Sequence, residues 1–168
     1  MSLLNDRAGP WTRAFAGRIR ADRRTVFNLL AEVELWPALF PHIRSARVVR
    51  RDGNRRLVVV RASWHGVPIG WTAIETLDEA EGRITLRHVS RLTRGSIAIW
   101  SVGPTMTLDD GGPAVDVSVD QEVTVPLPLI GGLLARRFVG GGVARGFGQA
   151  ILDRVRQVAE GGSLAGRD

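Results

Sequence analysis

The 168-residue sequence has no cysteine, no lysine and no tyrosine. Without cysteine the chain cannot form a disulfide framework, a thiolate nucleophile, an iron–sulfur cluster or a cysteine-ligated zinc site. Without lysine it has no Schiff base, no lysine general base and no P-loop lysine. The absence of tyrosine removes the phenol as an acid or hydrogen-bond donor. Any chemistry must therefore use other groups.

All 23 basic residues are arginine, and the net charge is +6. A sequence rich in Arg, Gly, Ala and Val and without lysine is typical of a GC-rich genome. The positive net charge is therefore weak evidence for a nucleic-acid partner. The arginines between residues 50 and 56 flank a turn and lack the interleaved aromatics that grip bases, so a nucleic-acid partner is not expected. Residues 1–61 hold 13 arginines against 5 acids, whereas residues 62–125 hold 4 against 9. This polarity would steer an acidic partner protein or a phosphate-bearing ligand, although a solvated basic surface is the simpler interpretation.

The length and a hydrophobic content of 44% fit one globular domain, which we place at residues 1–168 with its core at about 11–160. Asp6 and Arg7 precede any apolar run, which is wrong for a secretory signal. The longest apolar stretch, residues 125–135, is broken by Pro and Gly and falls short of the roughly 20 residues that span a bilayer. We therefore expect a cytoplasmic protein without a transmembrane segment.

The chain begins with a strand and two helical segments. Residues 15–20 alternate between apolar and polar, which predicts a strand with one solvent-exposed face. Asp22 is a candidate N-cap for a helix whose apolar residues recur at helical spacing: Val26, Leu29, Leu30 and Val33. Pro37 disfavours helical geometry at Trp36, so the helix should end or bend there, before a second short turn at residues 38–40.

From Ile43 onward the apolar period changes to that of strands, which we predict at residues 43–51, 55–64, 69–77, 83–92, 95–108 and 113–124. Asp52-Gly53-Asn54 is a strong hairpin signal. A final helix runs to about Glu160, with apolar residues at helical spacing from Phe147. Short links favour antiparallel pairing, so we predict an α+β fold: a seven-stranded curved sheet around a long C-terminal helix, with two short helices after the first strand. We expect a cavity between sheet and helix.

Three stretches carry a resemblance to a known superfamily: LLAEVELWPALFP at residues 29–41, RRDG at 50–53 and RITLRH at 83–88. Over residues 11–160 the chain resembles the helix-grip superfamily of START-like lipid carriers, pollen-allergen-like ligand binders, coenzyme-Q-binding proteins and bacterial polyketide aromatase/cyclases. The first stretch is similar to the polyketide cyclase and dehydrase proteins.

The resemblance implies an apolar cavity, an apolar or aromatic small-molecule ligand, and neither a metal nor an organic cofactor. In the aromatase/cyclases, aldol condensation and dehydration convert a carrier-bound poly-β-ketone into an aromatic ring, which would make an acidic carrier protein a partner. The chain departs from that pattern on residues 69–77, where those enzymes place a pocket arginine and this sequence has none.

Ligand-binding candidates lie on elements expected to line the cavity: Trp36, Phe40, Arg61, Trp64, Trp71, Trp100 and Phe138. Indole planes suit flat polycyclic ligands, although each Trp taken singly is more often a core residue. The catalytic candidates are His88 and Glu75. His88 shares a face with Ile84 and Leu86 and has the pKa range of a general acid or base, although a buried histidine is more often bonded to a backbone carbonyl.

Glu75 is a candidate partner for Arg61 or His88 if it points inward, but the alternation is ambiguous and the cost of burying a charge favours the outer face. His42 and His65 are expected at the surface. An inward cluster of His88, Glu75 and Arg61 would favour chemistry, whereas an apolar lining would favour a non-catalytic carrier of a lipid, quinone or isoprenoid. A third reading is a partner-binding module that uses the basic N-terminal part.

Glycines crowd residues 131–148 without the spacing of a phosphate loop, so we predict a mobile cavity entrance at about residues 126–142. The three histidines are dispersed and no G-x-S-x-G turn is present, so neither a metal centre nor a serine hydrolase is expected.

Overall fold

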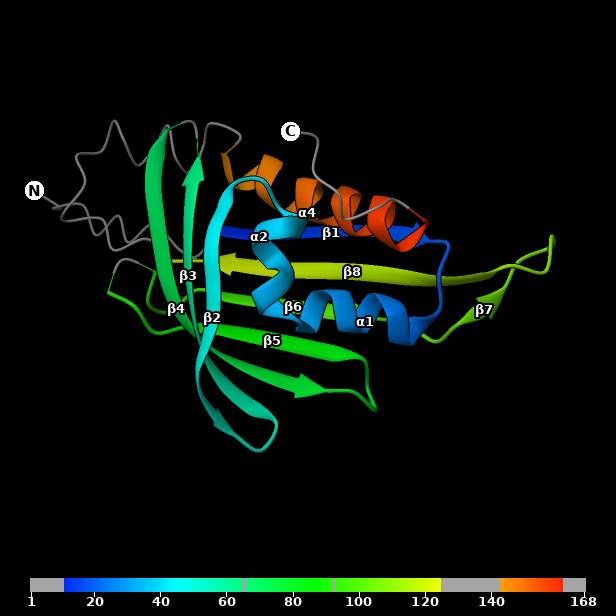
Figure 1. Cartoon of the computed structure of the whole chain (residues 1–168), viewed down its shortest axis with the longest axis horizontal. Helices are drawn as coiled ribbons and strands as arrows, with labels where there is room; N and C mark the ends of the chain where they lie inside the picture. Colours follow the sequence, from blue (N-terminus) through cyan, green and yellow to red (C-terminus); the bar gives the residue numbers. More distant parts are fainter. Residues whose placement is uncertain (1–10, 65, 92, 125–142, 162–168) are drawn as a thin grey trace, which may run out of the picture.

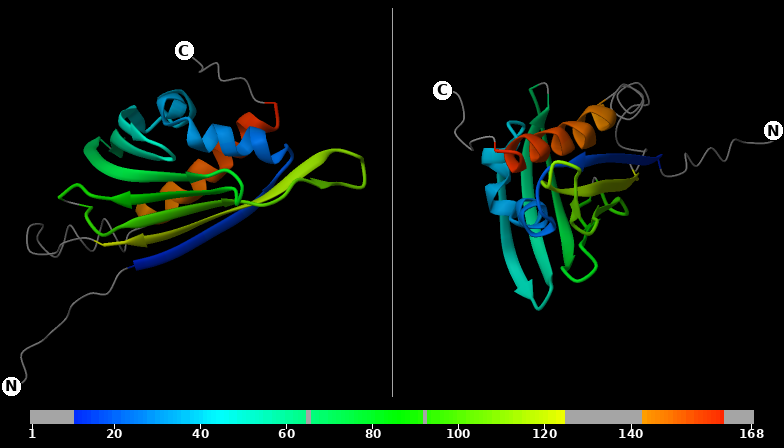
Figure 2. Two further views of the ribbon diagram at one scale, coloured as in Figure 1. Left: turned by 90° about the horizontal axis from the view of Figure 1, so that it is seen from below. Right: turned by 90° about the vertical axis from the view of Figure 1, so that its right-hand side faces the viewer.

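The computed structural model describes residues 11–64, 66–91, 93–124 and 143–161. It has the expected α+β architecture, with one curved antiparallel sheet whose concave face carries the described helices (Figures 1 and 2). The elements in chain order are β1 (Trp11–Ile19), α1 (Arg23–Ala31), the 3-10 helix η1 (Val33–Leu35), α2 (Trp36–Leu39), β2 (Ile43–Asp52), β3 (Arg55–Trp64), β4 (Val67–Asp78), β5 (Arg83–His88), β6 (Ile97–Val102), β7 (Met106–Thr107), β8 (Pro113–Val123) and α4 (Val143–Ala159).

The strands follow the order β1-β8-β6-β5-β4-β3-β2, and the short β7 pairs with β8 outside this path. β1 and β2 are therefore the two edges. The β2–β3 hairpin turns at Gly53, whose φ of 58° is a left-handed conformation that glycine adopts without strain. Both the hairpin and the antiparallel pairing agree with the sequence-based predictions.

Two predicted strands are shorter than expected. The strand predicted at residues 95–108 breaks into β6 and β7. The Gly103 N–H still bonds the Asp116 carbonyl of β8 at 2.8 Å, but Pro104 has no N–H with which to continue the ladder. The strand predicted at 83–92 ends at His88, since the hydroxyl of Ser90 accepts from Thr72 N–H at 3.1 Å in place of a backbone carbonyl. The described residues consequently form eight strands instead of the predicted seven.

The predicted N-cap is confirmed, because the Asp22 carboxylate accepts from Thr25 N–H at 2.9 Å. The predicted end of this helix is wrong. Helix α1 ends at Ala31, η1 follows, and α2 begins at Trp36 with Pro37 in its first turn. Proline is well suited to that turn, because its N–H is not needed there. Pro37 thus helps to begin a helix rather than to end one.

Helix α4 packs over β1 and beside α1 and α2, burying Leu152 and Val155 completely. Gly17 of β1 makes this close approach possible, since a Cβ at that position would lie 2.5 Å from Nη2 of Arg156 and 3.3 Å from Leu152. Inner-facing residues of the strands complete the core, among them Val58, Val60, Ile84, Val117 and Val119.

Candidate functional site

The concave face of the sheet carries fully buried side chains under the helices and half-buried side chains on β4 and β5. Under the helices, Trp36, Phe40 and Trp100 are at most 7% exposed and belong to the hydrophobic core. Trp36 donates its indole N–H to the Leu30 carbonyl at 3.2 Å and meets the edge of Phe40, with ring centroids 6.1 Å apart. Trp36, Phe40 and Trp100 therefore lie inside the core, and their binding of a ligand stays a prediction.

The half-buried side chains include Trp71 of β4 and His88 of β5. Both rings are half-buried and point to the concave face, because each lies two residues from a buried inner residue, Ala73 and Leu86. Their centroids are 5.9 Å apart and their planes are inclined by 20°, which is a stacked arrangement. This pair brings together one ligand-binding and one catalytic candidate of the sequence analysis.

His88 is an uncharged imidazole at neutral pH. Burial lowers its pKa to about 4 from the ordinary value near 6.5. Its Nδ1 is buried and has no hydrogen-bond partner among the described residues. A neutral imidazole has one N–H donor and one nitrogen acceptor, so His88 offers the concave face a polar group that no backbone carbonyl in the described chain satisfies.

Glu75 lies on the concave face and is completely buried, which overturns the expectation that the cost of burial keeps it outside. Arg56 of β3 offsets the cost of burying the Glu75 carboxylate. It lies directly opposite Glu75 on the neighbouring strand and is 5% exposed. Its Nε donates to Glu75 Oε2 at 2.7 Å, and its Nη2 donates to the same oxygen. Nη2 of Arg56 also donates to the Ala31 carbonyl at the end of α1. Burial still raises the pKa of Glu75, although Arg56 opposes that effect. Oε1 of Glu75 has no hydrogen-bond partner among the described residues.

The expected pairing of Glu75 with Arg61 is corrected. Arg61 is exposed and lies between the buried Val60 and Ala62, so it points to the convex face. Sequence reasoning missed Arg56, although its spacing of two and four residues from Val58 and Val60 places it on their face.

Five other predictions concern the surroundings of the site. Phe138, the predicted entrance at 126–142 and His65 lie outside the described residues, as does the side chain of Trp64. His42 was expected at the surface, but it is half-buried and stacks on Phe40 with centroids 6.2 Å apart, and burial lowers its pKa.

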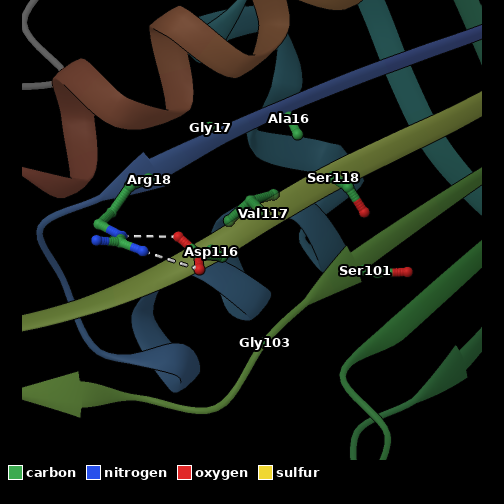
Figure 3. Close-up of a pocket in the computed structure, with 8 residues that line it drawn as sticks. All are labelled: Ala16, Gly17, Arg18, Ser101, Gly103, Asp116, Val117 and Ser118. Atoms are coloured by element: carbon green, nitrogen blue, oxygen red, sulfur yellow. Dashed lines mark hydrogen bonds and ion pairs between the residues drawn. The ribbon is translucent and has the colours of Figure 1, made fainter.

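The described residues also line an open groove of about 610 Å³, which lies where β1, β8 and β6 run side by side (Figure 3). An exposed Arg18–Asp116 pair crosses it, with two hydrogen bonds of 2.8 and 3.1 Å. None of the described residues that line the groove has a buried side-chain polar atom without a hydrogen-bond partner, whereas Glu75 and His88 on the concave face each have one. Its lining residues are Ala16, Gly17, Arg18, Ser101, Gly103, Asp116, Val117 and Ser118.

Neither a membrane span nor a metal-binding cluster is found within the described part of the chain. None of its helices is long and apolar enough to cross a bilayer. Its histidines and carboxylates nowhere gather in a group of three that could hold a metal ion.

Comparison with solved structures places this geometry among known folds. The chain is similar to an aromatase/cyclase from Streptomyces sp. R1128, with a TM-score of 0.73, 18% identity and coverage of 92% of this chain and 99% of that one. It is also similar to a START superfamily protein from Mycobacterium smegmatis, with a TM-score of 0.64, 19% identity and coverage of 89% and 99%. A third similar structure is the di-domain aromatase/cyclase BexL of the BE-7585A biosynthetic pathway, with a TM-score of 0.66, 23% identity and coverage of 88% and 47%.

These identities establish a common fold and no more. No curated protein sequence matches the chain. A family model described as polyketide cyclase / dehydrase and lipid transport matches residues 19–152, which include the sheet from the end of β1 to β8 and most of α4. The chain therefore belongs to the polyketide cyclase / dehydrase and lipid transport family.

Proposed function

We propose that the chain binds an apolar or aromatic carbonyl compound on the concave face and, without a cofactor, catalyses its aldol cyclisation and dehydration. The observation that carries the proposal is the Trp71–His88 pair, a flat aromatic face stacked on an uncharged imidazole with an unsatisfied nitrogen. Aromatic faces suit flat, unsaturated ligands, and a few convergent polar groups orient them.

His88 is the proposed acid–base group. Its free nitrogen would take the proton from a carbon between two ketones, and the resulting enolate carbon would bond to the carbon of a third ketone. The proton held by the imidazole would then pass to the new alkoxide. The freed imidazole nitrogen would take the second hydrogen of the same carbon and pass it to the departing hydroxyl, which leaves as water while the ring double bond forms. These steps consume no oxidant and release one water for each ring.

Glu75 is the proposed second polar group. It faces Leu86 across β4–β5 while His88 faces Ala73, so Glu75 and His88 are diagonal neighbours on one face. Diagonal neighbours on adjacent strands lie roughly 7–8 Å apart, a span that one multi-ketone chain can bridge. The unpartnered Oε1 of Glu75 would accept a hydrogen bond from an enol or hydroxyl of the ligand.

The activity test uses a poly-β-ketone thioester with a short thiol carrier, monitored by mass spectrometry for loss of water and by absorbance for the aromatic product. We expect His88→Gln to reduce turnover at least about 100-fold and to leave ligand binding within a few-fold, because the acid–base group is lost and the aromatic face stays. His42→Gln is the matched control, since it removes an imidazole that stacks on core Phe40 instead. Unchanged turnover in His88→Gln would remove its catalytic role.

A non-catalytic carrier of a lipid, quinone or isoprenoid is the second candidate. It is favoured by the lack of a free cation near the site among the residues that the structure describes: β4 has no arginine, and the Arg56 guanidinium is engaged by Glu75 and Ala31. Native mass spectrometry of the protein purified from its own host separates the two functions. A retained lipid or quinone that leaves unchanged indicates carriage, and release of a dehydrated ring compound indicates catalysis.

For a tethered substrate we expect an acidic carrier protein as the partner, because the β2–β3 hairpin is rich in exposed arginine. Mixing the chain with such a carrier, loaded and unloaded, and following complex formation by gel filtration tests this expectation.

A further inference from the structure

The convex face of the sheet carries positive, apolar and negative side chains in strand order. The register places Arg87 of β5 beside Ile97 of β6, and Ile97 beside Glu122 of β8. Two residues along β6, Ile99 lies beside Asp120 of β8. We call six residues of these three strands the convex patch: Arg83, Arg87, Ile97, Ile99, Asp120 and Glu122.

The side chains of the convex patch point away from the helices. The residues that alternate with them along the three strands are buried on the concave face, among them Leu86, Trp100 and Val119. The four charged residues of the patch are exposed and the two isoleucines are half-buried. Figures 1 and 2 show that the described helices all lie on the other side of the sheet.

The charges of the convex patch do not compensate one another within the chain. Opposite charges stabilise a sheet when they lie directly opposite each other on adjacent strands. Here Ile97 lies between Arg87 and Glu122, so their backbones are two strand spacings, or about 10 Å, apart. None of the four charged side chains belongs to an ion pair among the described residues. An apolar strip therefore separates a positive strand from a negative one.

We propose that the convex patch binds a second copy of the chain, back to back, across a twofold axis that runs along β6. This symmetry places β5 of one copy opposite β8 of the other, because these strands flank β6 on its two sides. Arg87 of each copy then faces Glu122 of the other, and the isoleucines of both copies meet at the axis. Sheets that pack face to face in this way lie about 10 Å apart.

The groove of Figure 3 fits the same arrangement. Ser101 and Ser118 are cross-strand neighbours in its lining, and they continue the rows of Ile99 and Asp120. Arg83 lies beside Ser101 on the other side, so the twofold axis places Arg83 of one copy opposite Ser118 of the other. The small side chains of the groove leave room for this guanidinium. Pairing of two copies thus fills the groove.

The size of the surface indicates a weak, reversible pair. The five strands from β4 to β1 and the residues from Asp116 to Glu122 both span about 20 Å. The contact therefore covers roughly 400 Å² of each copy, which is at the low end of interface sizes. Both concave faces remain uncovered in the pair, so the proposal does not depend on what binds there.

Other occupants match the convex patch less well. Anionic lipid or nucleic acid would be attracted by the arginines of β5 but repelled by Asp120 and Glu122. A partner with charges of one sign would leave either β5 or β8 without compensation. A second copy supplies both signs at matching positions.

The test is sedimentation equilibrium of the full chain from about 10 µM to about 1 mM, a range that resolves weak dimers. We expect the average mass to rise with concentration from 18.3 kDa toward twice that value. Arg87→Glu and Glu122→Arg should each weaken self-association at least about tenfold, because each change places like charges opposite one another. An equimolar mixture of these two variants should associate again, since one copy then has acids at both positions and the other has arginines.

Two matched comparisons complete the test. Ile97→Ser should weaken association at least about fivefold, whereas Ile97→Val should retain it, because only the serine removes the apolar contact. Arg24→Glu reverses an exposed charge on α1 and should change association less than about twofold. The charged side chains are exposed, so circular dichroism should show their variants folded.

Three results would overturn the proposal. The first is a wild-type chain that stays monomeric at the highest concentration. The second is self-association that Arg87→Glu leaves unchanged or that Arg24→Glu weakens equally. The third is failure of the two folded charge variants to associate when they are mixed.

Discussion

The neutral imidazole of His88 makes a pH-dependent contribution to stability that can be worked out from the structure. Burial lowers its pKa to about 4 in the folded chain, while the unfolded chain has the ordinary value near 6.5. Between these values the unfolded chain binds a proton that the folded chain does not. The contribution of His88 to the free energy of unfolding is therefore fully present above pH 6.5, and it decreases as the pH falls toward 4. The expected loss between pH 7 and pH 5 is about 2 kcal/mol, and the full loss is about 3 kcal/mol.

Urea unfolding at pH 7 and pH 5, for the wild type and for His88→Leu, isolates this contribution. Carboxylates contribute equally to both proteins, so the difference between their curves belongs to the imidazole. We expect wild type to lose about 2 kcal/mol more than His88→Leu over this pH range. Parallel loss in the two proteins would refute the assignment of His88 as a buried, uncharged group.

Three further predictions concern the fold around the site. Glu75→Leu should lower the free energy of unfolding in urea by about 3–5 kcal/mol, because it leaves Arg56 buried without its carboxylate. The double variant with Arg56→Met should regain at least half of that loss. A double variant no more stable than Glu75→Leu would contradict this. Asp22→Ala should cost about 1 kcal/mol and lower the melting temperature, because the N-cap of α1 is lost; an unchanged melting temperature would show that the cap is dispensable. Gly82→Ala should cost at least about 1 kcal/mol, because φ is +65° and a Cβ would lie 2.3 Å from the Val102 carbonyl, so a protein with wild-type stability would be unexpected.

The fold could be predicted from the sequence wherever a local signal had one structural solution. Alternation, the hairpin at Gly53 and the cap at Asp22 each depend on neighbouring residues, and all three agree with the structure. The helix end near Pro37 could not be predicted, because proline is equally compatible with the first turn of a new helix. The early end of β5 depends on a side-chain hydrogen bond between Ser90 and a distant strand, which no local pattern reveals.

The site was less predictable because its pairings depend on register. His88 follows Ile84 and Leu86 on one face, so its inward direction is readable from the sequence. Glu75 is different, because its burial requires a cation from another strand, and only the β3–β4 register places Arg56 rather than Arg61 opposite it. An unpaired carboxylate would indeed lie outside, but Arg56 offsets the cost of burying Glu75, and local sequence does not reveal that partner.

In the proposed function, the concave face beside Trp71 and His88 receives a flat carbonyl ligand. The most direct measurement is a histidine ¹⁵N NMR titration of the wild-type chain with a tricyclic aromatic ketone, with His88→Gln used to assign the signal. We predict saturable one-to-one binding that shifts the His88 ring nitrogens and leaves those of His42 in place. An unperturbed His88 signal under saturating ligand would contradict the account.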